Sequence, residues 1–202
     1  MSNGRFTYCS HSETFHVAED RPLITPKLMG LACQRVQQMK SIAWASTTER
    51  FEAEQPDVVR LLASVQASLD KTTNSILQTL TLGIWLAFRE QYPGLQPVRW
   101  DELAAVSAEF AKRFLSPPTC FCSQHQGLAI KATIEELEGR IDRKELPETG
   151  AIVVIQLMAS IIETLDRAAK QIPSQASNQG TAREGEERKS KPMNGKNTTT
   201  EL

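Results

Sequence analysis

Two thiols and one imidazole lie close together in the sequence, at Cys120, Cys122 and His125. Thiolate and imidazole are ligand types that zinc selects. The spacing is C-x-C-x-x-H, whereas zinc sites usually have roughly two to four residues between cysteines, and a tetrahedral structural site needs a fourth ligand. Cys9, His11 or His16, all on the N-terminal arm, could supply that ligand. Zinc is therefore the one cofactor that the sequence suggests, at Cys120, Cys122, His125 and Cys9.

The same two cysteines allow other interpretations. Neighbouring thiols at a helix N-terminus ionise readily and react with oxidants, which would make the loop a thiol-responsive regulatory element. However, cysteines two positions apart close only a small ring, and the chain contains no Cys-x-x-Cys motif. The alternative is that Cys120 and Cys122 are small, partly buried apolar side chains and that the histidines lie on a solvated surface.

Motifs of several enzyme classes are missing from the sequence. A di-iron bundle needs two Glu-x-x-His pairs on separate helices, and only Glu13–His16 has this form, in a segment not expected to be helical. The chain has no nucleophile elbow, phosphate loop or dinucleotide-binding turn. The carboxylate pairs Glu52/Glu54 and Glu135/Glu136 are typical of solvated helix faces. An enzyme without a recognisable motif stays open as an alternative.

The composition excludes two broad classes of protein. With 40% hydrophobic and 23% charged residues, the 202-residue chain differs from disordered polymers and from membrane bundles. Its 23 Lys and Arg balance 24 Asp and Glu, so we expect no nucleic-acid partner. The longest apolar stretches, residues 76–88 and 151–165, are shorter than the about 20 residues that span a bilayer, so we expect no membrane association. Only four cysteines, and no apolar run behind Arg5, favour the cytoplasm.

Apolar side chains recur at helical spacing through residues 23–172, which predicts an all-α domain. We expect a compact bundle of about six helices, with a weakly structured N-terminal arm at 1–22 and a disordered tail at 173–202. The helices are expected from Pro26 toward Phe51, from Pro56 toward Leu69, from about Ser75 to Tyr92, from Asp101 to Phe114, around residues 130–141, and after Pro147. The polar run at 70–74 should end or kink the second helix. The third and sixth are the most apolar, so we expect them side by side in the interior.

Two aromatic residues suggest an interface. Trp44 and Phe51 fall near the end of the first predicted helix and off its main apolar stripe, and an exposed apolar strip usually marks an interaction surface. The alternative is that they complete the core. Our prediction is a non-enzymatic protein–protein interaction or assembly module, whose partner is another protein or a second copy of the chain. A zinc-binding or thiol-responsive regulator is the second hypothesis.

Overall fold

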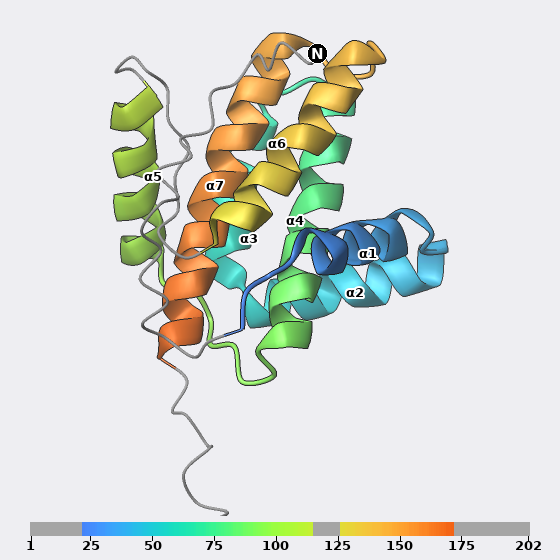
Figure 1. The fold of residues 1–202 in the computed structure, drawn as a ribbon. Coiled ribbons are helices and arrows are strands. Elements are labelled where there is room, and N and C mark those ends of the chain that lie inside the picture. Colours follow the sequence, from blue (N-terminus) through green and yellow to red (C-terminus); the bar gives the residue numbers. More distant parts are fainter. Residues whose placement is uncertain (1–21, 115–125, 172–202) are drawn as a thin grey trace, which may run out of the picture. The chain divides into compact units, whose positions relative to one another are not determined.

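The computed structural model describes residues 22–114 and 126–171. These residues form an all-α fold of seven helices without a strand, as the apolar spacing predicts (Figure 1). The helices are α1 (Pro26–Gln37), α2 (Ser41–Glu54), α3 (Pro56–Gln66), α4 (Lys71–Gln91), α5 (Trp100–Phe114), α6 (Gly127–Asp142) and α7 (Glu148–Lys170). The predicted tail, and the predicted arm except for Pro22, lie outside the described residues.

The two helices with the most buried residues, α4 and α7, pack against each other, which confirms the expected pairing (Figure 1). Glycine allows a close approach where they meet: a Cβ atom at Gly150 of α7 would lie 2.7 Å from the hydroxyl of Thr73 on α4. Other helices pack against these two: α4 contacts α1 and α2, and α7 contacts α5 and α6. The core therefore centres on α4 and α7.

The predicted helix from Pro26 toward Phe51 is wrong in one respect, because the structure divides it into α1 and α2. The chain turns at residues 38–40 and reverses direction (Figure 1). No Pro or Gly marks this turn. Packing explains the turn. Helix α1 packs on α4 and buries Val36, and the reversal then brings Phe51 of α2 back to Trp85 of α4, with ring centroids 5.4 Å apart. A straight helix would carry Phe51 away from the core.

The polar run at 70–74 neither ends nor kinks a helix; it begins α4. Asp70 is the N-cap, and its Oδ1 accepts hydrogen bonds from the backbone N–H groups of Thr72 at 2.9 Å and Thr73 at 3.0 Å. These bonds satisfy donors that have no partner inside the helix. Helix α4 therefore starts earlier than Ser75, and α3 ends at Gln66.

Two side chains near the start of α3 hold the segment that leads into α5. The buried amide of Gln55 accepts a hydrogen bond from the Val98 N–H at 2.9 Å and donates to the Gln96 carbonyl at 3.3 Å. Asp57 accepts from the N–H of Trp100, the first residue of α5, at 2.9 Å. The start of α5 is thus fixed against α3 by bonds across more than forty sequence positions.

Helix α7 is long and apolar enough to cross a membrane, by length and composition alone. Of its most apolar 18-residue window, 61% is buried inside the bundle. A core helix of a soluble protein has the same composition, because it must be apolar on most faces. Its place among α4, α5 and α6 accounts for this apolar sequence.

Candidate functional site

The candidate zinc ligands Cys9, Cys120, Cys122 and His125 all lie outside the described residues. Within residues 22–114 and 126–171, no three His, Cys, Asp or Glu side chains are grouped closely enough to hold a metal ion. The zinc site therefore stays a prediction from the sequence.

Trp44 and Phe51, the two predicted interface residues, have different environments. Phe51 is buried against Trp85, so its ring is part of the core, as the alternative interpretation expected. Trp44 is half-buried and packs on the edge of the core. Both nevertheless line a cavity of about 320 Å³ between α2, α3 and α4, which we call the α2–α3 groove. Its other lining residues are Thr48, Glu52, Val59, Leu62, Ala63, Gln66, Gln78 and Leu82.

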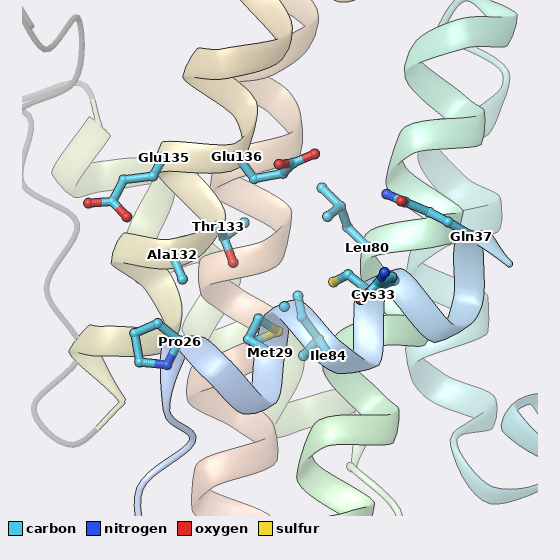
Figure 2. A pocket seen from close by; sticks show the side chains of 12 residues that line it. Pro26, Met29, Cys33, Gln37, Leu80, Ile84, Ala132, Thr133, Glu135 and Glu136 are labelled. Atoms are coloured by element: carbon cyan, nitrogen blue, oxygen red, sulfur yellow. The ribbon is translucent and has the colours of Figure 1, made fainter.

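A larger cavity of about 460 Å³ lies between α1 and α6, over α4; we call it the α1–α6 groove (Figure 2). Leu80 and Ile84 of α4 form its floor with Met29 of α1. The walls come from the two facing helices: Pro26, Gly30, Cys33, Gln34 and Gln37 on α1, and Ala132, Thr133, Glu135 and Glu136 on α6. Its volume falls in the range of about 300–1,000 Å³ that is common for binding sites.

Helix α1 lies close on α4 because α4 has a glycine at the crossing. A Cβ atom at Gly83 would lie 2.6 Å from Sγ of Cys33 and 3.1 Å from its Cα. Real Cβ atoms do not approach other atoms this closely, so only glycine fits here. The crossing fixes where α1 runs, and with it the position of one wall of the α1–α6 groove.

The thiol of Cys33 is poorly suited to chemistry. Burial raises the pKa of Cys33 to about 11, with a further increase from the charge of Glu136 and a smaller opposing effect of Arg140. The thiolate is the nucleophilic and metal-binding form of cysteine, and at neutral pH this cysteine is almost entirely protonated. Cys33 therefore acts as an apolar wall of the groove.

Gly30, on the α1 wall, has space around it. A Cβ atom there would meet no other atom within 4 Å, in contrast to Gly83 and Gly150, where neighbouring side chains exclude one. A glycine inside a helix destabilises it by about 0.5–1 kcal/mol relative to alanine. No packing contact within the described structure requires glycine at this position, so the open space is a feature of the groove itself.

Large exposed apolar side chains occur mainly on or just before α1 and α6, outside the lining residues of the groove. Four large apolar residues are exposed in the described chain, and three of them lie on or just before the two wall helices: Leu23 (41%), Leu31 (51%) and Leu128 (45%). A hydrogen bond of 3.0 Å from the Ile24 N–H to the Gln126 side chain joins the segments that carry Leu23 and Leu128.

The carboxylates of the α1–α6 groove do not form a catalytic pair. Glu136 is paired with Arg140 at 2.8 Å, and Glu135 with Lys131 at 3.8 Å, each along α6. None of the described lining residues is a histidine, and the three histidines of the chain lie outside the described residues. These carboxylates give the α6 wall a negative charge rather than acid–base chemistry. The sequence did not predict this groove, although Gly30 in the middle of an amphipathic helix was a local signal for it.

No protein-family model matches the chain, and comparisons with curated proteins and with solved structures find no similar protein.

Proposed function

We propose that the protein is a non-enzymatic interaction module, and that its α1–α6 groove binds an amphipathic helix of a partner protein. The observation that carries this proposal is a cavity of about 460 Å³ with an apolar floor of Leu80 and Ile84 and with the exposed Gly30 on its α1 wall. Contiguous exposed apolar surface with a polar rim is typical of interaction sites. We place the module in the cytoplasm, without nucleic acid, membrane or a resident cofactor, in line with the charge balance and cysteine content.

The dimensions of the groove suit a helix. It follows α1 from Pro26 to Gln37, which is about 16 Å, or three helical turns, at 1.5 Å per residue. Small side chains on the facing walls, among them Gly30 and Ala132, allow a helix backbone to come close. Helix-in-groove binding uses apolar anchors spaced by three and four residues, and the floor of Leu80 and Ile84 would accept them.

The charge of the rim indicates the chemistry of the partner helix. Among the described residues that line the groove, Glu135 and Glu136 on α6 are the only charged ones. Glu135 is exposed and its contact with Lys131 is long, so this pair contributes little and leaves the carboxylate available. A partner helix with lysine or arginine beside its apolar face would therefore complement the groove better than an acidic one.

The test compares two labelled peptides that share one apolar helical face and carry either lysine or glutamate beside it. Fluorescence anisotropy with the full-length protein is expected to show saturable binding of the lysine peptide and weaker binding of the glutamate peptide. Gly30→Leu fills the groove from an exposed position and should lower the affinity roughly tenfold or more. Glu135→Lys should reverse the preference between the peptides, whereas Glu49→Lys, on an exposed position outside both grooves, should not.

Two results would overturn the proposal. The first is equal binding of both peptides that is insensitive to Gly30→Leu, in protein whose circular dichroism is unchanged. The second is a native mass that shows a dimer disrupted by Gly30→Leu, because a second copy would then be the occupant of the groove.

A further inference from the structure

Two polar side chains that line the α2–α3 groove, Thr48 and Glu52, have no hydrogen-bond or ion-pair partner among the described residues. The Oγ1 atom of Thr48 is buried and has no hydrogen-bond partner. No ion pair or hydrogen bond within the described part of the chain involves the carboxylate of Glu52, although nearby Glu54 contacts both Arg50 and Arg89. Buried polar groups are nearly always paired in folded proteins, so an unpaired one at a cavity calls for an explanation.

These groups lie in a row on one face of α2. Trp44, Thr48 and Glu52 are four residues apart, so they occupy successive turns of the helix and all line the groove. The row therefore presents an aromatic ring, a hydroxyl and a carboxylate in order. Opposite it, Leu62 of α3 and Leu82 of α4 supply apolar surface.

We propose that the α2–α3 groove binds a small aromatic amine. The ring of the ligand would lie against Trp44 and the part of the Phe51 ring that lines the groove, where aromatic contacts favour tilted or offset arrangements. Its ammonium group would lie near Glu52 at the mouth. The buried Thr48 hydroxyl has no hydrogen bond to lose, so rotation of its side chain about χ1 toward the groove would let it accept a hydrogen bond from the ammonium.

The charge of the lining decides between amines and acids. Glu52 is the single charged residue among the ten that line the groove, so no cation is present to hold an anionic ligand. An aromatic carboxylate would be repelled by Glu52, whereas a neutral ring would gain the apolar contacts alone. A cavity of about 320 Å³ is at the small end of the range for binding sites, which suits a ligand of one or two rings.

Helix α2 provides a second readout of binding. Phe51 is the only fully buried residue among its 14, so few contacts hold the helix to the bundle. A ligand between α2 and α3 would add contacts on both sides. Amide hydrogen exchange across residues 41–54 should therefore slow when the groove is occupied.

The experiment uses the full-length protein with tryptamine, indole and indole-3-acetate as probes. Calorimetric titration is expected to show tryptamine binding about fivefold more tightly than indole, since an exposed ion pair contributes this much, and indole-3-acetate binding most weakly. Glu52→Gln should abolish the preference for tryptamine over indole. Glu49→Gln, on the same helix but outside the groove, should preserve it.

Steric blocking separates the site from unspecific binding. Ala63→Phe adds a ring from an exposed position on the lining and should prevent both tryptamine binding and the slower exchange of α2. The proposal is overturned if no probe binds, or if Glu52→Gln and Ala63→Phe leave tryptamine affinity and exchange unchanged. The inference uses a different groove from the proposed helix docking, so neither outcome decides the other.

Discussion

Cys33 of α1 packs directly over Gly83 of α4, with no room for a side chain between them. A Cβ atom on Gly83 would lie 2.6 Å from the Cys33 Sγ atom and 3.1 and 3.3 Å from its Cα and N atoms. Turning the thiol aside would therefore relieve only part of the clash. Because Cys33 also lines the α1–α6 groove, this crossing connects the packing of the core to the geometry of the proposed docking surface.

We expect Gly83→Ala to destabilise the protein by about 1–3 kcal/mol, as overpacked core positions do. Gly30→Ala is the matched variant on the partner helix. It should stabilise the protein by about 0.5–1 kcal/mol, because its Cβ atom meets nothing and alanine favours the helix. Urea unfolding measures both free energies. Changes of the same sign and size in the two variants would contradict the close contact at Gly83.

Lys144 takes a backbone conformation that favours glycine. Its φ is 59°, and it follows α6 in a turn where the Glu145 N–H bonds to the Arg140 carbonyl and the Lys144 N–H to that of Ile141, each at 2.9 Å. This is the Schellman pattern of a helix C-terminus. Lys144→Gly should raise the free energy of unfolding by about 0.5–1 kcal/mol. Lys144→Ala, which keeps a Cβ atom, is the control and should show little gain; equal gains in both would exclude the backbone explanation.

Asp70 should make stability depend on pH in the acid range. The hydrogen bond from the Thr73 hydroxyl, followed by that from the Thr73 N–H, lowers the pKa of Asp70 below the ordinary value of 3.8 for an aspartate. A carboxylate with a lowered pKa in the folded state stabilises the protein above its unfolded pKa, and this stabilisation is lost as the pH falls through the folded pKa. Asp70→Asn caps the helix without titrating.

The stability difference between wild type and Asp70→Asn should therefore shrink as the pH is lowered from 7 through 3.8 and below. Thermal unfolding of both proteins over this range measures it, and carboxyl-detected NMR titration gives the pKa directly. A difference that stays constant with pH would contradict the capping role of the ionised carboxylate.

Cys33 should react slowly with alkylating reagents. With a pKa of about 11, its thiolate fraction at pH 7 is on the order of 10⁻⁴, so iodoacetamide should modify it about a hundredfold or more slowly than a free cysteine. Mass spectrometry of digested protein follows this residue separately from the other three cysteines. The same residue in urea-unfolded protein is the internal control, and equal rates in the folded and unfolded protein would contradict burial of the thiol.

Local sequence patterns predicted much of the helical fold. Thr25 before Pro26 correctly indicated the start of α1, and the Thr25 hydroxyl indeed caps the helix by accepting from the Leu28 N–H. Pro56 correctly opened α3, since proline suits the first helical position. The apolar periodicity of residues 76–88 and 151–165 identified the two central helices. These signals act over a few residues, so they are visible without the tertiary structure.

Other features depended on contacts between distant residues. The division of the first predicted helix into α1 and α2 was decided by Phe51 reaching Trp85, and the burial of Phe51 followed from the same contact. Asp70 could have ended one helix or begun the next, and packing of Thr73 against α7 accompanies the second outcome. The spacing of apolar residues in the sequence shows which face of a helix is apolar, but it does not show which other element packs against that face.

The sequence by itself determined that the described chain is helical, where most helices lie, and which two are central, because helix formation and burial are recorded in local spacing and composition. Only the tertiary structure decided where the grooves lie. Their walls come from residues as far apart as Gly30 and Thr133, or Trp44 and Leu82, and no local pattern relates such positions. The zinc site at Cys9, Cys120, Cys122 and His125 stays a prediction from the sequence, because these residues lie outside the described ones.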